Sequence, residues 1–558
     1  MAPPLAPSLR ARLGSRVGRA RWTLSTLTRA GLVAPISPAA YARMGLAVRR
    51  GGTHALSGVA LSAARVPDAP AVVDERGSIT WAELHAQADA VAAAFATMGP
   101  GGGRPTTIAL LVRNHRGFVV ALAAATRVGA DTLLLNTGFA GPQLAEVVAR
   151  EGIDVLVHDE EFEGIVAGVR EAQPDARYVL AWTDAPDGPV TDRPTLDGLA
   201  HGHAGQSVAR PERFGRLVLL TSGTTGTPKG AARPPGGGAG DLSAVLDRVP
   251  WRYGETVVVA APMFHAWGFG QLVIAAVMGC TIVTRRRFDP EATLAAVDAH
   301  RATGLSVVPV MLERIVDLPD EVLDRYSCST LRFVTASGSR MRPDAVLAFM
   351  DRFGDTVYNS YNATEAGQIA TAVPADLRVA PDTAGRPVAG TEVRILDAEG
   401  REVPAGEIGQ LWVRNTTQFE GYTSGDSKSF LEGFMASGDL GRLDEAGRLY
   451  VVGRDDDMIV SGGENVYPLE VEQCIDAMGT VREVVVVGVD DEAFGQRLAA
   501  YVVAVPGASL TVDDVKAHVK AELAGYKVPR HVVFLDELPR NATGKVVKRD
   551  LPSSGAAG

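Results

Sequence analysis

Ten consecutive residues after an apolar run have the side chains and the backbone freedom that a polyphosphate-binding loop requires. They read Thr221-Ser222-Gly223-Thr224-Thr225-Gly226-Thr227-Pro228-Lys229-Gly230. The glycines allow tight turns, the Thr and Ser hydroxyls donate hydrogen bonds, and the lysine supplies positive charge. A Walker A loop reads G-x4-G-K-[ST], whereas here Pro228 precedes the lysine and Gly230 follows it. The stretch therefore predicts a phosphate-binding loop and excludes the motor and GTPase classes.

These residues resemble the phosphate-binding signature of the adenylate-forming superfamily, which includes acyl-CoA synthetases, luciferases and adenylation domains of peptide synthetases. Further motifs that resemble this family follow in the family's order over roughly residues 60–550. The overall resemblance is to bacterial, particularly actinobacterial, fatty acyl-CoA synthetases. It implies that the protein activates a carboxylic acid, here expected to be a medium- or long-chain fatty acid, with ATP. The acyl adenylate would then react with coenzyme A, with release of AMP and pyrophosphate overall.

A histidine within an aromatic stretch is the candidate for the acid-binding side of the site. The stretch Pro262–Gly270 follows the apolar run Val257–Ala260 and contains His265, Trp267 and Phe269. In the family that it resembles, the matching histidine borders the acyl site. A histidine in an apolar run is otherwise most often a core residue. Trp267 and Phe269 are candidate walls of an acyl tunnel, with filling of the core as the alternative.

A third motif, Asn359–Glu365, ends a further predicted strand. By resemblance, Tyr361 offers a flat face to adenine, Thr364 a hydroxyl to a phosphoryl oxygen, and Glu365 an oxygen ligand to Mg2+. Asn362 stands where the family often has glycine. Because asparagine tolerates positive φ better than most residues, we expect altered loop packing here and retained function.

Two charged residues near predicted strands are candidates for binding the nucleotide sugar. Asp439 lies in Ser437-Gly438-Asp439, which precedes a predicted strand, and Arg454 follows the run Leu449–Val452. A carboxylate can accept both hydroxyls of a ribose, and an arginine can donate to ribose and phosphate oxygens. The resemblance assigns these roles to the two residues, whereas an isolated Asp and Arg would more often be a solvated pair.

The last motifs concern a mobile carboxyl-terminal domain. By resemblance, Asp456 is the hinge, and Gly462 and Gly463 let the backbone approach the pantetheine arm of coenzyme A. Lys545 closes the motif Pro539–Lys545 and would meet the reacting carboxylate and the α-phosphate. The predicted catalytic residues are Lys545, His265, Thr364 and Glu365. The residues assigned to ATP and coenzyme A are Thr221, Ser222, Gly223, Thr224, Thr225, Gly226, Thr227, Lys229, Tyr361, Asp439, Arg454, Gly462 and Gly463.

Short β-branched runs alternate with helical stretches from Asp68 to about residue 360, which predicts largely parallel sheets covered by helices. Ligand sites in such sheets lie on loops after the carboxyl ends of strands. The box Thr80-Trp81-Ala82-Glu83 opens a helix to about Thr97. The predicted strands are Ile108–Val112, Thr132–Leu135, Val155–His158, Leu217–Leu220, Val257–Ala260, Thr281–Thr284, Ser306–Val310 and Leu331–Val334.

Around residues 385–452 the sequence pattern changes to short predicted strands with Gly and Pro turns, which predicts a small β-rich subdomain. After Gly453 the chain restarts as a compact α+β unit. We therefore expect an α/β protein with three parts. These are a basic amino-terminal segment (1–67), an AMP-binding adenylation domain (68–453) and a mobile lid domain (454–558).

The amino-terminal segment differs in charge from the rest of the chain. Residues 1–67 hold ten arginines and no Asp, Glu or Lys, although the whole chain has a net charge of −10. An apolar stripe flanked by arginines is typical of an interfacial helix on anionic lipid. The alternatives are a helix packed on the body of the protein or a loose tail.

The cysteine content and the net charge argue against several kinds of site and partner. Cys280, Cys328 and Cys474 form no CxxC pair, which argues against a disulfide framework and a zinc site and suits a reducing cytoplasm. The negative net charge gives no reason to expect a nucleic-acid partner. We expect a cytoplasmic enzyme, with residues 1–67 available for peripheral contact with the inner face of the membrane. No feature indicates an oligomeric state.

Other readings stay open beside the fatty acid–CoA ligase. One is an acyl-AMP ligase that delivers to a carrier protein, although no carrier domain follows Lys545. Another is a CoA ligase for aryl or steroid side-chain acids, since Ala524–Arg530 resembles ligases of both fatty and aryl acids. A catalytically dead scaffold is disfavoured because each expected functional position holds a competent side chain.

Overall fold

The computed structural model describes residues 16–553 with short gaps, and its contacts divide the chain into two compact units. Unit 1 comprises Met1–Asp382, Val388–Thr391 and Asn415–Ser427, and unit 2 comprises Thr383–Pro387, Glu392–Arg414 and Lys428–Gly558. The residues that are not described within this range are 53, 55, 185–192, 222–228, 234–237, 364, 419–420, 423–427, 458, 462–463, 492–494 and 542–543.

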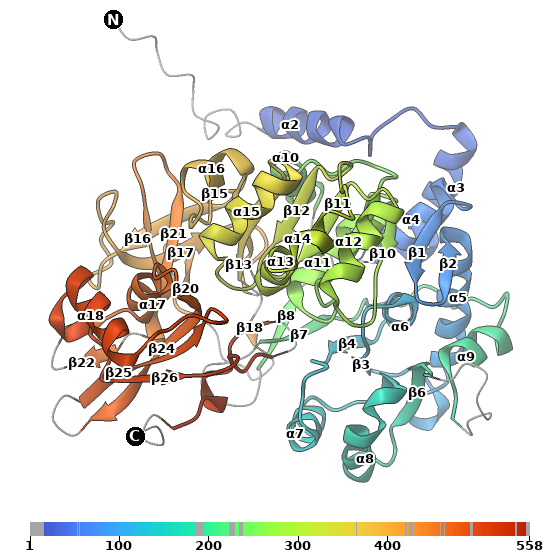
Figure 1. Ribbon diagram of the computed structural model, residues 1–558. Coiled ribbons are helices and arrows are strands. Elements are labelled where there is room, and N and C mark those ends of the chain that lie inside the picture. The colour runs from blue at the N-terminus through green and yellow to red at the C-terminus, as the bar shows by residue number, and fades with distance from the viewer. Residues whose placement is uncertain are drawn as a thin grey trace, which may run out of the picture. The chain divides into compact units, whose positions relative to one another are not determined.

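The first sheet of unit 1 has the strand order β14-β13-β12-β11-β9-β10-β1-β2 (Figure 1). Neighbouring strands run parallel except in the β1–β2 and β13–β14 pairs. The central strands are short and almost wholly buried, as expected of a parallel sheet that is covered on both faces. The strands are β1 (Pro70–Asp74), β2 (Gly77–Thr80), β9 (Thr256–Val259), β10 (Thr281–Val283), β11 (Gly304–Val307), β12 (Phe333–Ala336), β13 (Val357–Ala363) and β14 (Gly367–Ala372).

The second sheet of unit 1 has the order β18-β8-β7-β4-β3-β5-β6. It is parallel from β7 to β6, and the β7–β8 and β8–β18 pairs are antiparallel. Its strands are β3 (Thr107–Leu111), β4 (Asp131–Leu134), β5 (Val155–Asp159), β6 (Arg177–Trp182), β7 (Leu217–Thr221), β8 (Lys229–Arg233) and β18 (Gly421–Tyr422).

Helices separate and cover the two sheets. Helix α6 (Arg116–Val128) contacts β1 of the first sheet and β3, β4 and β6 of the second, so it lies between them. It packs on α5 (Trp81–Phe95), which opens with the predicted capping box of Thr80 and Glu83. Buried side chains of α12 (Pro290–Ala299), α13 (Pro309–Val316) and α15 (Pro343–Phe353) share a core with the first sheet. Those of α7 (Gly141–Glu151) and α8 (Glu163–Ala172) share one with the second sheet.

The described part of the basic segment, from residue 16 onward, is packed on unit 1. Helix α2 (Arg16–Arg29) contacts α10 (Ala239–Arg248), and α4 (Ser57–Arg65) contacts α11 (Ala266–Val277). The Arg65 guanidinium lies 3.7 Å from the centre of the Tyr253 ring and donates to the Leu32 carbonyl at 2.7 Å. Helix α3 (Pro38–Gly51) packs on α4 but leaves most of its surface exposed. Among the described helices, none combines the length and apolar character that crossing a membrane requires.

Unit 2 contains two sheets. In the antiparallel one, β16 (Glu392–Leu396), β17 (Gly409–Arg414), β20 (Phe434–Leu443) and β19 (Phe430–Leu431) follow in that order, and β21 (Leu449–Arg454) also pairs with β20. The other sheet has the order β23-β22-β25-β24, with β26 parallel to β25. Helices α17 (Pro468–Asp476) and α18 (Val512–Glu522) share its core. Its strands are β22 (Ile459–Ser461), β23 (Glu464–Val466), β24 (Val481–Asp491), β25 (Gly495–Ala504) and β26 (His531–Phe534).

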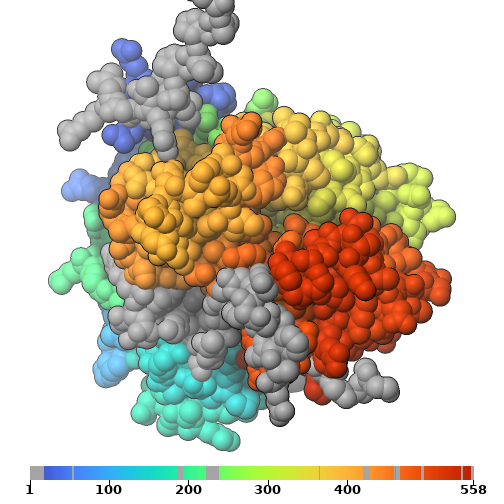
Figure 2. Space-filling model, turned by 90° about the vertical axis from the view of Figure 1, so that its left-hand side faces the viewer, coloured from blue at the N-terminus to red at the C-terminus, as the bar shows by residue number. Residues whose placement is uncertain are grey.

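This architecture confirms the predicted α/β class, with helix-covered, largely parallel sheets and a smaller α+β part at the carboxyl terminus. In the space-filling view the carboxyl-terminal residues, coloured red, form one compact mass (Figure 2). The remaining elements are α9 (Leu196–Gly202), α14 (Asp320–Leu323), α16 (Pro374–Val379), β15 (Arg386–Pro387) and the 3-10 turns Pro100–Gly102, Glu160–Phe162, Asp455–Asp457, Gly525–Lys527 and Lys548–Asp550.

Candidate active site

In unit 1, two of the predicted motifs lie at the same edge of the first sheet. His265 follows the carboxyl end of β9, and Tyr361 and Glu365 lie at the carboxyl end of β13. These strands are parallel within the sheet and are separated by β11 and β12, so their axes are about 14 Å apart. His265 is half-buried and forms the N-cap of α11. Thr364 lies outside the described residues.

The departure from the family pattern at Asn362 has a local explanation. Asn362 lies in the extended strand β13 and is not among the residues with positive φ, so our expectation that its tolerance of positive φ matters here is wrong. Instead, the β13–β14 register shifts between Tyr361 and Asn362, and the Asn362 amide donates to Ser337 Oγ at 2.9 Å. Since Ser337 follows β12, the amide joins the ends of two adjacent strands.

The base of the predicted phosphate loop lies in the second sheet. Strand β7 ends at Thr221, β8 begins at Lys229, and these two residues are register partners in the antiparallel pair. The loop therefore leaves the carboxyl end of β7 and returns to the same place. The predicted ligands Ser222, Gly223, Thr224, Thr225, Gly226 and Thr227 lie outside the described residues.

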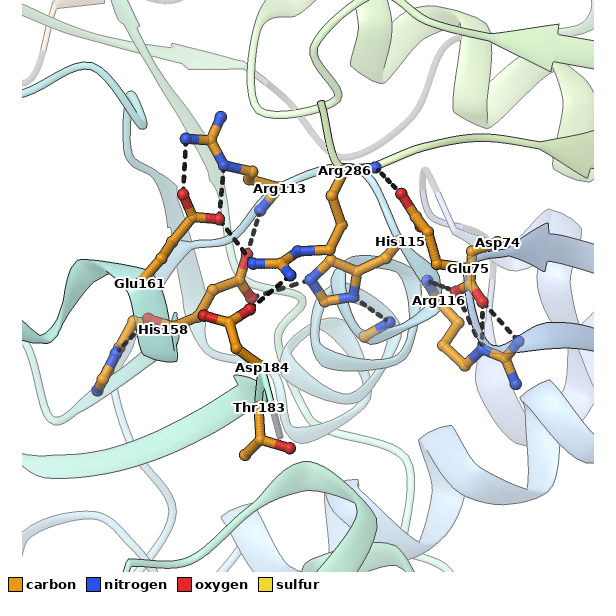
Figure 3. A network of polar contacts seen from close by, with 12 residues as sticks. Asp74, Glu75, Arg113, His115, Arg116, His158, Glu161, Thr183, Asp184 and Arg286 are labelled. Atoms are coloured by element: carbon orange, nitrogen blue, oxygen red, sulfur yellow. Dashed lines mark hydrogen bonds and ion pairs between the residues drawn. The ribbon is translucent and has the colours of Figure 1, made fainter. Parts of the chain in front are cut away.

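A polar network that the sequence did not reveal joins the carboxyl ends of strands from both sheets (Figure 3). Asp159, at the end of β5, accepts from the Arg113 backbone N–H at 2.9 Å and contacts His115 Nε2 at 2.9 Å. His115 Nδ1 accepts from the Gly117 N–H, which leaves Nε2–H to donate to Asp159. Asp74, at the end of β1, accepts from the Arg116 backbone N–H at 2.9 Å.

Glu161 binds three arginine side chains at the edge of this network. Its carboxylate accepts from Arg113 Nε at 2.7 Å, Arg286 Nη2 at 2.7 Å and Arg287 Nη2 at 2.8 Å. Burial alone would raise the pKa of Glu161, but the hydrogen bonds from Arg113 and Arg287 outweigh burial and lower the pKa to about 2. Glu161 therefore stays ionised at neutral pH and binds three arginine side chains at once.

In unit 2, the predicted ribose-binding pair and the terminal lysine are brought together. Asp439 and Arg454 are register partners in the β20–β21 pair, and Arg454 Nη1 lies 3.5 Å from Asp439 Oδ1. Asp439 does not precede a strand, as we predicted, but lies inside β20 after Gly438, whose φ of +83° turns the chain locally. Both residues act electrostatically on Lys545.

Lys545 has the perturbed charge expected of a functional amine. Its side chain is exposed, yet nearby protein atoms partly desolvate its ammonium. This partial desolvation, followed by the charge of Arg454, lowers the pKa of its ammonium from the ordinary value of 10.5, while Asp457 and Asp439 oppose the shift. A lysine that interacts with two carboxylates and two other cations, Arg454 and Lys548, is suited to binding an additional anion.

The predicted hinge and the glycine pair are only partly described. Asp456 lies in the 3-10 turn Asp455–Asp457, where Asp455 accepts from Gln410 Nε2 at 3.0 Å and Asp457 lies 2.9 Å from Lys548 Nζ. Gly462 and Gly463 lie outside the described residues, between the paired strands β22 and β23.

The two aromatic residues proposed for the acyl tunnel are buried. Trp267 belongs to the core around the first sheet, and its indole N–H donates to the Val307 carbonyl at 2.8 Å. Phe269 is also buried in α11. These contacts account for Trp267 as a core residue, and the role of either ring in binding an acid stays a prediction.

Comparison with known families shows what these motifs belong to. The model of the AMP-binding enzyme family matches residues 59–423, and that of the AMP-binding enzyme C-terminal domain matches residues 470–545. The chain belongs to the AMP-binding enzyme family. This confirms the adenylate-forming superfamily that the motifs predicted.

Similar proteins span nearly the same length as the chain. An indoleacetate–CoA ligase of Aromatoleum aromaticum is 32% identical over 482 residues, covering 85% of this chain and 92% of the relative. A feruloyl-CoA synthase of an Amycolatopsis species is 31% identical over 491 residues, covering 87% and 96%. The crystal structure of ATP-bound MatB from Rhodopseudomonas palustris superposes with a TM-score of 0.77 at 28% identity, covering 89% and 98%.

Proposed function

We propose that this protein is an ATP-dependent acid–CoA ligase, which forms an acyl adenylate and then transfers the acyl group to coenzyme A. The observation that carries the proposal is the Asp439–Arg454 pair in unit 2, with which Lys545 interacts electrostatically. A sugar-binding carboxylate, a phosphate-binding guanidinium and a lysine with a lowered pKa form a set that suits a nucleotide under attack at its α-phosphorus.

The residues divide the work of adenylation between binding and charge stabilisation. Asp439 accepts the ribose hydroxyls, Arg454 donates to ribose or phosphate oxygens, and Tyr361 stacks on adenine. The acid carboxylate attacks the α-phosphorus, the bond to the pyrophosphate oxygen breaks, and pyrophosphate leaves. Lys545 donates to the oxygens on which negative charge develops, an electrostatic contribution that is typically worth a few kcal/mol per group. Thr364 and His265 complete the phosphate and acyl sides of the site.

The donor set suits Mg2+ that is bound mainly by the nucleotide. No group of three or more metal-binding side chains occurs among the described residues. Mg2+ is commonly held by one or two carboxylates together with substrate phosphates, so Glu365 alone is sufficient on the protein side. When bound, the ion would neutralise phosphate charge.

The second step requires a thiol at the carbonyl that Lys545 faced in the first step. We propose that a domain of residues 454–558 turns about Asp456 relative to residues 68–453. The turn withdraws Lys545 and presents the Gly462–Gly463 backbone to the pantetheine arm. The thiol of coenzyme A attacks the acyl carbon and AMP leaves, so the protein supplies no covalent nucleophile.

For the acid, we propose an aromatic or aryl-alkyl carboxylic acid as the first class to test. The relatives that support this act, by name, on indoleacetate and form feruloyl-CoA. Medium- and long-chain fatty acids, which the overall resemblance to fatty acyl-CoA synthetases suggested, form the second class, and steroid side-chain acids the third. A panel of these acids, scored by AMP release with ATP and coenzyme A, is expected to give the highest kcat/KM for an aromatic acid. A fatty acid as the best substrate would overturn the assignment of acid class and leave the ligase intact.

The same assay separates the rival functions. If AMP and acyl-CoA form together, the protein is a CoA ligase. If acyl adenylate forms but only a carrier phosphopantetheine accepts the acyl group, it is an acyl-AMP ligase that serves a carrier. If no acid in the panel supports pyrophosphate exchange, the enzyme proposal fails and a scaffold remains.

We further propose that the amino-terminal helices touch an anionic membrane surface from the cytoplasm. Helix α3 exposes Tyr41 (54%), Leu46 (43%) and Val48 (38%) and carries Arg43, Arg49 and Arg50. No acidic residue occurs before Asp68, so this surface complements anionic lipid.

Vesicle sedimentation tests this contact. The protein is expected to bind phosphatidylglycerol vesicles more than phosphatidylcholine vesicles, and a triple Tyr41→Ser, Leu46→Ser, Val48→Ser variant should lose binding. Val379→Ser, at an apolar residue that is 71% exposed elsewhere in unit 1, should not. Equal binding to both vesicles, or self-association through α3 in their absence, would overturn the proposal.

A further inference from the structure

Asn114, in the loop after β3 of the second sheet, binds the backbone segment that follows β9 of the first sheet and leads to His265. Asn114 follows β3 and is buried. Its Nδ2 donates to the Ala261 carbonyl at 2.9 Å, and its Oδ1 accepts from the Met263 backbone N–H at 2.8 Å. The Asn114 amide therefore uses both its donor and its acceptor on the three-residue segment Ala261–Met263. This fixes the position and the direction of that backbone segment.

The loop that carries Asn114 is itself held by hydrogen bonds. The residues on either side of Asn114 are held by the buried carboxylate of Asp159, through the Arg113 backbone N–H at 2.9 Å and through His115 Nε2 at 2.9 Å. The next residue, Arg116, donates its backbone N–H to Asp74 of the first sheet. Asn114 thus stands in a loop that is fixed to both sheets, and it has little freedom to follow the segment it holds.

The backbone segment that Asn114 binds is also held by contacts on its opposite side. The backbone N–H groups of Ala260 and Ala261 donate to the Ser306 carbonyl of β11 at 3.0 and 2.9 Å. Helix α11 approaches so closely that a Cβ on Gly268 would lie 2.7 Å from the Ala261 carbonyl oxygen. His265, two residues after Met263, therefore follows a segment that is held from both sides.

We propose that Asn114 is a positioning residue for the acid half of the reaction. The predicted phosphate loop follows β7 of the second sheet, whereas His265 follows β9 of the first sheet. The Asn114 bridge between the loops after β3 and β9 fixes the separation between these two halves, and hence between the acid carboxylate and the nucleotide. The inference rests on the proposed ligase function, because it assigns His265 to the acid side.

The test compares the Asn114→Ala variant with His265→Ala and with the double variant, using the best acid from the substrate panel. Asn114→Ala removes both hydrogen bonds, so kcat/KM for the acid should fall by roughly tenfold or more while KM for ATP is unchanged. If Asn114 acts through His265, the double variant should be little worse than the worse single variant. A purely structural role would not produce this non-additivity.

Two further variants keep the test decisive. Asn114→Asp retains an acceptor for the Met263 N–H but sets a carboxylate against the Ala261 carbonyl, so it should lose the acid step like the alanine variant. Thr284→Val is the matched control, because Thr284 is buried and donates to the Val259 carbonyl of β9 at 2.8 Å without reaching Ala261. It should lower the melting temperature but leave acid kinetics unchanged.

Several outcomes would overturn the inference. These are additive effects of Asn114→Ala and His265→Ala, an equal rise of KM for ATP and acid, or a similar kinetic defect in Thr284→Val. Failure of both Asn114 variants to fold, with Thr284→Val folded, would assign Asn114 to stability instead. The wild-type assay is independent of these results, since absence of any acyl-CoA product would reject the ligase function itself.

Discussion

At the residue scale, the charge state of Lys545 makes a testable statement about pH. Burial and then Arg454 lower its pKa, while Asp457 raises it. Adenylation needs the ammonium form, so activity should fall on the alkaline side below the ordinary lysine pKa of 10.5. Asp457→Asn removes a stabilising carboxylate, and the alkaline limb of the rate of pyrophosphate exchange should therefore move to lower pH.

A variant of opposite sign serves as the control. Lys548 lowers the pKa of Lys545 and lies 2.9 Å from Asp457. Lys548→Met removes that repulsion and leaves Asp457 unpaired beside Lys545, so the alkaline limb should move to higher pH. Shifts of the same sign in the two variants would show that Lys545 does not set this limb.

Asp439, Arg454 and Lys545 could be singled out from the sequence because they match local motifs of a family that the chain resembles. The structure pairs Asp439 with Arg454, and both act electrostatically on Lys545. Asn114 and Asp159 were missed, since an amide or a carboxylate at a strand end has no local signature. Asn114 holds a backbone group 149 residues away, and such a pair becomes visible only when the order of strands is known.

At the scale of elements, the two glycines of α11, Gly268 and Gly270, differ in the space that surrounds them. A Cβ on Gly268 would lie 2.7 Å from the Ala261 carbonyl oxygen and closer still to Pro262, whereas one on Gly270 would meet nothing within 4 Å. Gly268→Ala should destabilise the protein by about 1–3 kcal/mol through overpacking and lower the activity with acid. Gly270→Ala should be neutral or more stable by up to about 1 kcal/mol, since alanine favours helices. Urea unfolding of the two variants measures the difference, and equal stability would contradict it.

The turn between α3 and α4 should be sensitive to acid. His54 Nδ1 accepts from the Leu56 N–H at 3.2 Å, and the centre of its ring lies 5.2 Å from that of the tilted Phe214 ring. Burial, followed by the charge of Arg127, lowers the pKa of His54 from 6.5 to about 4. Between these values the unfolded chain binds a proton that the folded chain does not. The stability that the neutral ring contributes is therefore complete above pH 6.5 and is lost as pH falls toward 4.

The loss between pH 7 and pH 5 should amount to about 2 kcal/mol of the free energy of unfolding. His54→Leu cannot take up the proton, so the pH dependence of its unfolding should be smaller by this amount. Urea titrations of both proteins at the two pH values measure it. An unchanged pH dependence in the variant would refute the assignment.

Most element boundaries followed from local patterns. The capping box of Thr80 and Glu83 opens α5 as predicted. The predicted strand Ser306–Val310 is instead β11 (Gly304–Val307), because Pro309 starts α13 and ends the extended run. The predicted strand Leu331–Val334 lies two residues further on, at Phe333–Ala336. An apolar run tells that a strand exists, but its ends depend on pairing with neighbours that are distant in sequence.

At the scale of the whole molecule, the proposed reaction uses Lys545 in only one of its two steps. Lys545→Ala should abolish adenylate formation, measured as acid-dependent pyrophosphate exchange. It should leave transfer from a chemically prepared acyl adenylate to coenzyme A largely intact, because the thiol step needs the lysine withdrawn. Lys520→Ala, at an exposed lysine of α18 that belongs to none of the motifs, is the control and should retain both steps. Loss of both steps in Lys545→Ala alone would argue against a turning domain.

The carboxylates of Asp74 and Asp159 have a consequence for how unit 1 unfolds. Each ends a strand of a different sheet, and both hold the loop after β3 through backbone N–H groups. The donors to Asp159 belong to the same sheet as Asp159, whereas Asp74 of the first sheet accepts from Arg116, which follows β3 of the second. Melting of the second sheet would therefore take the Arg116 donors away from the buried Asp74 carboxylate and destabilise the first sheet. Hydrogen exchange should accordingly report an opening free energy at β1 that does not exceed the one at β3.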